Sequence, residues 1–275
     1  MTAPRRGTAG IWAGALVAAA VLSAGCDVRM GEGGGFSFDL ARGHASDTWT
    51  RTYTITQGGV IEIINVNGEV RAEASDGSTV EVSAERRTSA SSDEAARELL
   101  DKIEMREEAG PSKVRIETRS PRVTFGGQSV RYTVRVPRGV HVDLRTVNGG
   151  VVLEGVGGEV RAASTNGGIR GRVADASLVE ARTTNGGVEL DLSGAFADSG
   201  HMTLSSVNGG IRLRVPETVK ADVNARCTNG RVSVSDLSFE AEGEQSRRRA
   251  AGRLNGGGAR FDLSTVNGGV AISRS

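Results

Sequence analysis

TTNGGVELDL, residues 183–192, is the stretch that decides the fold, because five further segments share its frame. These are TVNGGVVLEG (146–155), STNGGIRGRV (164–173), SVNGGIRLRV (206–215), CTNGRVSVSD (227–236) and TVNGGVAISR (265–274). Successive asparagines lie 18, 19, 23, 21 and 38 residues apart, and an outlying copy surrounds Asn67. A repeat of about 20 residues is typical of stacked β architectures, and Asn-Gly between alternating runs marks a turn between strands.

Apolar and polar residues alternate on both sides of each Asn-Gly, which predicts a strand before and after every turn. The outward columns alternate in charge from copy to copy, as in Asp143, Arg161 and Glu180. Neighbouring parallel strands lie about 4.8 Å apart, where opposite charges attract. The pattern therefore predicts an all-β fold, a parallel β-helix or β-solenoid with Asn-Gly corners. A meander of hairpins is the alternative.

Six asparagines are the predicted structural corner of this fold. They are Asn148, Asn166, Asn185, Asn208, Asn229 and Asn267. Asn tolerates positive φ and its amide can bond from rung to rung, while the glycines that follow take a bend that a Cβ would obstruct. Two places before each Asn stands Thr or Ser, except for Cys227, so this cysteine is interpreted as a wall residue, with a reactive thiol as the alternative.

The amino terminus resembles a bacterial lipoprotein signal peptide over residues 1–25. Arg5 and Arg6 precede an almost wholly apolar run at 11–24, and small residues then lead to Cys26. That resemblance implies a diacylglycerol on the sulfur of Cys26, which would hold an exported protein on a membrane of the cell envelope, its leaflet left open. An ordinary cleaved signal and an uncleaved anchor are the alternatives.

The remaining chain divides into three predicted parts. Residues 26–47 form a Gly-rich flexible tether, 48–138 an N-terminal cap with the first rung, and 139–275 the repeats. Within the cap, Ser91 opens a capping box and apolar residues at helical spacing predict one capping α-helix near 92–106. Residues 236–260 are either a degenerate rung or a solvated loop, the latter a good place for a binding site. Val270 and Ile272 lie near the carboxyl end, so a terminal rung could pair with a second copy.

Over residues 50–275 the chain resembles a bacterial family named "putative adhesins", domains of unknown function with recurrent Asn-Gly rungs. The opening YTITQGGVIEIINVNGEVRAEAS, the entry strand VRYTVRVPRGVHVDLRTVNGG and the repeats after it carry the resemblance. It implies a parallel β-helix-like fold, frequent export with a lipid anchor, and a surface-binding role. It supplies no catalytic residue.

Composition and motifs exclude several functions. With 34 Lys+Arg against 33 Asp+Glu, the net charge of +1 argues against a nucleic-acid partner. The three histidines, His44, His141 and His201, have no metal-ligand spacing, and no nucleophile or phosphate-loop motif occurs. We expect no cofactor, no metal and no catalysis.

The expected function is binding or scaffolding at the envelope, with a surface polysaccharide or an envelope protein as partner. An envelope-stress or regulatory accessory protein facing the periplasm is the alternative, and a carbohydrate-active enzyme a third. The sequence leaves the oligomeric state open.

Overall fold

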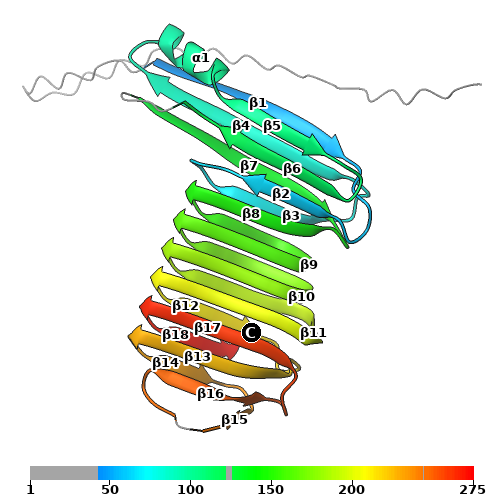
Figure 1. The fold of residues 1–275 in the computed structure, drawn as a ribbon, viewed down its shortest axis with the longest axis vertical. Helices are drawn as coiled ribbons and strands as arrows, with labels where there is room; N and C mark the ends of the chain where they lie inside the picture. The colour runs from blue at the N-terminus through cyan, green and yellow to red at the C-terminus, as the bar shows by residue number, and fades with distance from the viewer. Residues whose placement is uncertain (1–42, 122–125, 244) are drawn as a thin grey trace, which may run out of the picture.

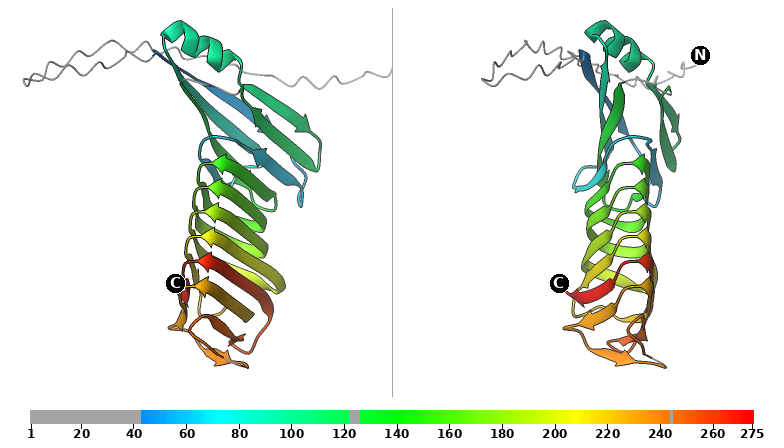
Figure 2. Two further views of the ribbon diagram at one scale, coloured as in Figure 1. Left: turned by 60° about the vertical axis from the view of Figure 1, so that its left-hand side comes forward. Right: turned by 90° about the vertical axis from the view of Figure 1, so that its left-hand side faces the viewer.

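The computed structural model describes residues 43–121, 126–243 and 245–275, and the fold there is mostly β (Figure 1). It holds 18 strands and the helix α1 (Asp93–Asp101). The strands stack along one long axis, with an antiparallel layer at the N-terminal end (Figure 2). In the described residues, no helix has the length and apolarity to cross a membrane.

Two parallel ladders of strands form the body of the stack and meet at the Asn-Gly corner. The strands are β2 (Val60–Ile64), β3 (Val70–Ser75), β8 (His141–Asn148), β9 (Val151–Asn166), β10 (Ile169–Asn185), β11 (Val188–Asn208), β12 (Ile211–Val215), β13 (Ala221–Asn229), β14 (Val232–Ser235), β17 (Ala259–Asn267) and β18 (Val270–Arg274). The repeat register is regular, because each asparagine lies beside the asparagine of the next rung.

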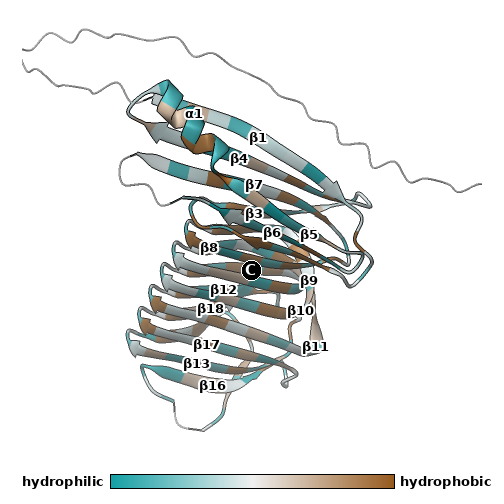
Figure 3. Cartoon of the chain, turned by 45° about the horizontal axis from the view of Figure 1, so that its top comes forward, coloured by the Kyte–Doolittle hydropathy of each residue, from teal (hydrophilic) through white to brown (hydrophobic). Residues whose placement is uncertain are grey.

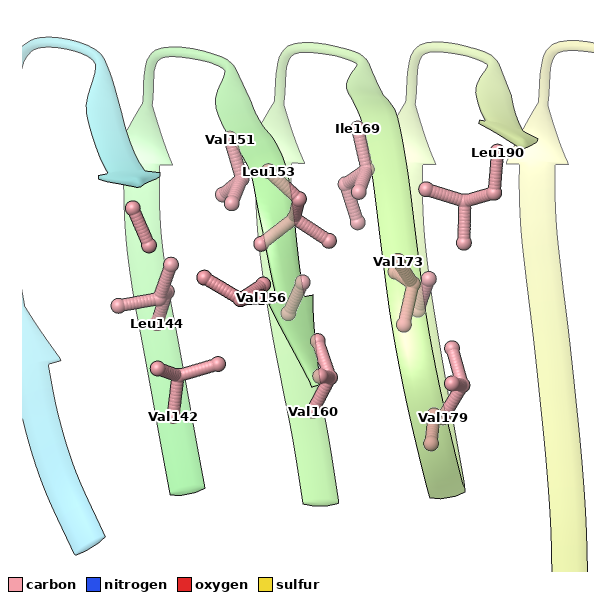
Figure 4. Packing of buried hydrophobic residues seen from close by; sticks show 14 of the residues in the cluster. Val142, Leu144, Val151, Leu153, Val156, Val160, Ile169, Val173, Val179 and Leu190 are labelled. Atoms are coloured by element: carbon pink, nitrogen blue, oxygen red, sulfur yellow. The ribbon is translucent and has the colours of Figure 1, made fainter. Parts of the chain in front are cut away.

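The core fills the narrow space between the two ladders. Alternate residues of each strand point inward, among them Val151, Leu153 and Val160, all 0% exposed (Figure 4). The hydropathy of the strands alternates accordingly (Figure 3). Small and β-branched side chains suffice here because the facing sheets lie close together.

The last two rungs are interleaved rather than stacked in chain order. β17 lies between β11 and β13, pairing in parallel with both, and β18 lies likewise between β12 and β14. The spatial order of the corner asparagines therefore ends Asn208, Asn267, Asn229. Val270 and Ile272 are each 1% exposed inside the stack. They therefore do not form an exposed terminal rung that could pair with a second copy.

The N-terminal end is closed by antiparallel strands. These are β1 (Gly43–Tyr53), β4 (Val80–Ala90), β5 (Glu104–Ala109), β6 (Lys113–Arg119) and β7 (Gly127–Pro137). β7 pairs in parallel with β3, and β6 pairs in parallel with β2, so both continue the ladders. The remaining strands pair antiparallel: β4 with β7, β1 with β4, and β5 with β6. Helix α1 packs on β1 and β4.

The helix differs from its prediction at both ends. Ser92, not Ser91, is the N-cap, and its Oγ accepts from the N–H of Ala95 at 3.2 Å. The helix ends at Asp101, and the expected last turn belongs to strand β5 instead. Two adjacent serines can each cap, and the side chain that reaches the N–H of the residue three positions on decides between them.

The distal end is also closed by an antiparallel hairpin, so residues 236–260 are not a degenerate rung, and the exposed loop is confined to the connection between the two strands of the hairpin. β15 (Phe239–Ala241) pairs with β16 (Arg249–Leu254), which pairs with β13. Arg253 and Glu242 form an ion pair across it, with Nη2 and Oε1 2.7 Å apart.

The predicted parallel β-helix or β-solenoid is therefore wrong as the fold class. The sheet is mixed, with antiparallel pairings at both ends and a last repeat inserted out of order. Strands outside the Asn-Gly frame have no corner at which to turn, and they pair antiparallel instead, with the consecutive pairs β5–β6 and β15–β16 at the two ends of the stack.

A column of buried hydroxyls ties each rung to its neighbour. Each hydroxyl donates to the carbonyl of the first glycine on the adjacent rung: Thr146 to Gly68, Ser164 to Gly149, Thr183 to Gly167, Ser206 to Gly186 and Thr265 to Gly209, at 2.7 to 3.1 Å. Cys227 is the buried, free cysteine that occupies this column in the final rung.

We expect Cys227→Thr to stabilise the protein by about 1 kcal/mol. The threonine hydroxyl would donate to the carbonyl of Gly268, whereas a thiol is a weak donor. Chemical denaturation of the purified chain measures the change. A lower midpoint than wild type would show that the thiol fills space that a hydroxyl and methyl cannot.

Candidate functional site

The corner asparagines form a continuous amide ladder along the stack. Each Nδ2 donates to the Oδ1 of the preceding rung: Asn148 to Asn67, Asn166 to Asn148, Asn185 to Asn166, Asn208 to Asn185, Asn267 to Asn208 and Asn229 to Asn267, at 2.7 to 2.9 Å. The ladder thus brings together all six residues of the predicted corner. The expected positive φ is not found: among the described residues other than glycine, only Asp175, Asp236 and Asn255 have it.

The first glycine after each Asn is required by the backbone. A Cβ at Gly186 would lie 2.3 Å from the carbonyl oxygen of Gly167, and one at Gly209 would lie 2.1 Å from that of Gly186. Neighbouring rungs approach so closely here that no side chain fits. Every repeat keeps glycine at this position, Gly230 included.

The second glycine is not required to the same degree. A Cβ at Gly187 would lie 3.1 Å from the oxygen of Gly210, and one at Gly168 would lie 3.3 Å from that of Gly187. A small movement of the neighbour relieves such contacts. Arg231 stands in this row in the terminal rung and Glu69 in the first, so the row does accept side chains. Backbone sterics alone therefore do not account for the five glycines between them.

Four of these glycines, Gly168, Gly187, Gly210 and Gly269, line an open groove with a volume of about 570 Å³. We call it the glycine-floored groove. The first ladder is made of the strand segments that precede each Asn-Gly corner, and the second ladder is made of those that follow it. The lining of the groove comes from the second ladder: Gly168, Ile169, Arg170, Gly187, Val188, Glu189, Gly210, Ile211, Arg212, Arg231, Ser233, Gly269, Val270 and Ala271. The lining spans five rungs, roughly 20 Å at the usual strand spacing.

The charged side chains along the groove are mostly paired. Arg170 Nη2 lies 3.2 Å from Glu69 Oε2, and Arg212 Nη1 lies 3.1 Å from Glu189 Oε1. Arg231 is exposed, and in the part of the chain that the structure describes no carboxylate pairs with it. The groove therefore offers paired donors and acceptors along its length and one available cation at its distal end.

The outward charge columns lie in register, yet many ion pairs run along a strand. Asp143 lies beside Arg161, and Arg161 beside Glu180, in the parallel ladder. Their closest opposite charges are within the strand, however, as in Arg145 with Asp143 at 2.7 Å. The predicted attraction between rungs is found for Arg214 with Asp191 at 2.9 Å. A smaller hollow of about 210 Å³ lies on the first ladder, lined by Asp143, Arg145, Arg161, Ala162, Ala163, Glu180 and Arg182.

Acid–base groups are neutralised where they are buried. Glu62 is 3% exposed and lies 2.8 Å from Lys113 Nζ and 3.1 Å from Arg115 Nη1. Burial alone would raise the pKa of Glu62, but the hydrogen bond from Lys113 and the charge of Arg115 outweigh it and lower the pKa. A carboxylate held ionised between cations is a poor proton donor or general base near neutral pH.

The histidines do not converge. His141 Nδ1 accepts from the N–H of Glu159 at 2.9 Å, while His201 Nε2 lies 3.0 Å from Thr203 Oγ1. His44 is on β1, in the N-terminal layer. No three His, Cys, Asp or Glu side chains within the described ranges could hold a metal ion together. The predicted lipidation site, Cys26, lies outside the described residues.

The sequence interpretation missed the groove because both glycines were assigned to the turn. The available signal was the departure of two copies from the frame, NGE at 67–69 and NGR at 229–231. A position that accepts Glu and Arg at the two ends does not need glycine for its backbone, which points to a surface kept bare.

Comparison with known proteins supports the fold and gives no family assignment. No protein-family model and no curated protein matches this chain. Solved structures do match. A putative cell adhesion protein from Clostridium sporogenes has a TM-score of 0.50 and 12% identity, covering 83% of this chain and 100% of its own.

Two further structures align over a similar length. A putative adhesin from Bacteroides fragilis has a TM-score of 0.32 at 11% identity, covering 82% of this chain and 96% of its own. A putative lipid binding protein from Parabacteroides distasonis has a TM-score of 0.26 at 10% identity, covering 83% of this chain and 96% of its own. The Clostridium sporogenes structure supports the predicted resemblance in one respect: the described chain has a fold like that of a protein named for cell adhesion.

Proposed function

We propose that this chain is a non-catalytic binding module of the cell envelope that holds a strand of acidic polysaccharide in the glycine-floored groove. The observation that carries the proposal is the row of second glycines, which the backbone requires much less than it requires the first glycines and which leaves a long floor of exposed peptide planes. The adhesion-related name of the Clostridium sporogenes structure agrees with a role in surface binding.

The shape of the groove suits an extended polymer. It runs across strands of equal spacing, so it presents the same chemical pattern rung after rung over roughly 20 Å. Sugar rings have flat faces that can lie on bare peptide planes. A protruding side chain at Gly187 or Gly210 would prevent this contact.

The charges of the groove suit a sugar better than a peptide or a nucleic acid. Glu189 and Arg212 stand side by side and can accept from and donate to hydroxyl groups. The available guanidinium of Arg231 matches the carboxylate of an acidic sugar, which it can bind through two parallel hydrogen bonds. Donors and acceptors set side by side fit the hydroxyl groups of a sugar, which a row of phosphates does not offer.

Calorimetric titration of the purified full chain with polygalacturonate tests the proposal, with neutral dextran as the comparison polymer. We expect binding to polygalacturonate that weakens as salt rises. Arg231→Ala and Gly187→Ala should each weaken it about tenfold, the first by removing a charge-assisted bond and the second by raising the floor.

Arg182→Ala is the matched control, because Arg182 is an exposed arginine on the first ladder, outside the groove. It should bind like wild type. Equal affinity of the Gly187→Ala variant and wild type would contradict the groove as the site. Shortening of the polymer during titration would instead favour the carbohydrate-active enzyme.

A further inference from the structure

The Asn-Gly bonds of the ladder share one sequence but differ in one structural respect. In five rungs, the N–H of the first glycine donates to the main-chain carbonyl of the Asn on the next rung: Gly149 to Asn166, Gly167 to Asn185, Gly186 to Asn208, Gly209 to Asn267 and Gly268 to Asn229, at 2.9 to 3.1 Å. Gly68 donates likewise to Asn148 at 2.8 Å. The asparagine that precedes each of these six glycines also accepts, through its Oδ1, from the next amide of the ladder.

The terminal rung lacks both bonds. Among the described residues, no carbonyl accepts from the N–H of Gly230, and no amide donates to Asn229 Oδ1. Gly230 is also exposed, whereas the first glycines of the repeats from Gly149 onward are half-buried.

The closing hairpin explains why this corner is left open. β16 pairs with β13 as far as Arg226, and the chain beyond accepts from the N–H of Cys227 at 2.9 Å and of Val232 at 2.9 Å. An antiparallel strand with no Asn-Gly frame cannot follow the parallel rung around its bend. Residues 228–231 therefore lie outside the pairing with β16 and the chain before it.

We propose that Asn229 is a site of spontaneous deamidation, and that the same ladder protects the other repeat asparagines. The main-chain nitrogen of Gly230 loses its proton to water and attacks Cγ of Asn229. The new N–Cγ bond closes a succinimide as the Cγ–Nδ2 bond breaks, and Nδ2 leaves as ammonia with the proton. Water then opens either carbonyl of the ring, giving aspartate or isoaspartate.

The protected rungs oppose this reaction at both reacting atoms. Their glycine nitrogen must give up a hydrogen bond before it can attack, and their carboxamide is held by the ladder on both its oxygen and its nitrogen. The carboxamide of Asn229 keeps a single ladder bond, to Asn267 Oδ1 at 2.8 Å. Releasing one hydrogen bond of ordinary strength corresponds to about a tenfold difference in rate.

The product would alter the end of the stack. A carboxylate at position 229 cannot donate to Asn267 Oδ1, so the last bond of the ladder becomes a repulsion between two acceptors. Isoaspartate would in addition lengthen the main chain at the corner between β13 and β14. The modification thus converts the terminal rung into a less stable one as the protein ages.

Peptide mapping by mass spectrometry tests the proposal on the full chain, incubated at mildly alkaline pH in ordinary and in ¹⁸O water. We expect the mass of the Asn-to-Asp exchange at Asn229, with label incorporated, to accumulate about tenfold faster than at Asn166, Asn185 or Asn208. These internal repeats are matched controls, because they share the Asn-Gly sequence and an exposed side chain.

Asn255-Gly256, in the segment between β16 and β17, is a second control. Its Nδ2 donates to the carbonyls of Glu217 and Val219, both at 2.7 Å, which fixes the carboxamide. Denaturing the protein should make all Asn-Gly sites react alike. Equal rates at Asn229 and Asn185 in the folded chain, or no reaction at Asn229 while the denatured chain reacts, would overturn the proposal.

Discussion

Alanine at Gly186 is expected to destabilise the protein by about 3 kcal/mol, whereas alanine at its neighbour Gly187 should cost less than about 1 kcal/mol. The new Cβ at Gly186 would lie 2.3 Å from the carbonyl oxygen of Gly167 and 2.8 Å from the nitrogen of Gly168. Both atoms belong to a hydrogen-bonded rung, so relief would require two rungs to separate. At Gly187 the nearest atom is one oxygen at 3.1 Å.

Thermal and chemical unfolding of the two variants, followed by circular dichroism, measures this difference. The pair is well matched because the residues are adjacent and the substitution is the same. Similar stability of the two variants would show that the rungs slide more freely than their hydrogen bonds indicate. The folded Gly187→Ala protein also serves the polysaccharide titration, since loss of binding there could not be ascribed to unfolding.

Removal of residues 256–275 is expected to release the distal third of the stack, although only the C-terminal end of the chain is lost. β17 and β18 occupy the interior, and Phe261, Leu263, Val270 and Ile272 are each 1% exposed or less. Burying each such side chain stabilises by about 1.5 to 3 kcal/mol, a sum comparable with the whole stability of a domain.

Amide hydrogen exchange followed by mass spectrometry tests this expectation peptide by peptide. In the truncated chain, β12, β13 and β14 should lose protection while β8 and β9 keep it. Ser273→Asp, an outward-facing change on β18, is the control for an effect of sequence alone and should leave protection intact. If β13 and β14 stay protected after truncation, they have docked directly on β11 and β12, and the inserted repeat is dispensable.

Much of the register could be predicted from the sequence, because the column of Thr146, Ser164 and Thr183 carries Thr or Ser in each of the six repeats except that of Cys227. The order of the last two rungs could not. Asn229 and Asn267 head rungs whose inward columns are both apolar and differ in residue size, as with Val223 and Phe261. Exchanging the two rungs therefore leaves the periodic pattern unchanged. The choice depends on the hairpin at 239–254, which has no repeat frame from which to infer its pairing.

The antiparallel ends escaped prediction for a related reason. A strand such as β4 or β7 alternates with a period of two whether its neighbour runs parallel or antiparallel, so alternation fixes the face and not the direction. The glycine-floored groove escaped prediction for a different reason. In Asn-Gly-Gly both glycines are typical of a turn, and only the distances to the next rung separate Gly186, which must be glycine, from Gly187, which need not.

The one-way amide ladder also gives the stack an electrical polarity. All its side-chain dipoles point the same way, so they add up as peptide dipoles do in a helix, with partial positive charge at Asn67 and partial negative charge at Asn229. The two departures from the glycine row match this field, since Glu69 stands at the positive end and Arg231 at the negative end. The field therefore favours each of these two side chains where it stands, and at the distal end it is the charge of Arg231, not the ladder, that would attract an anionic sugar.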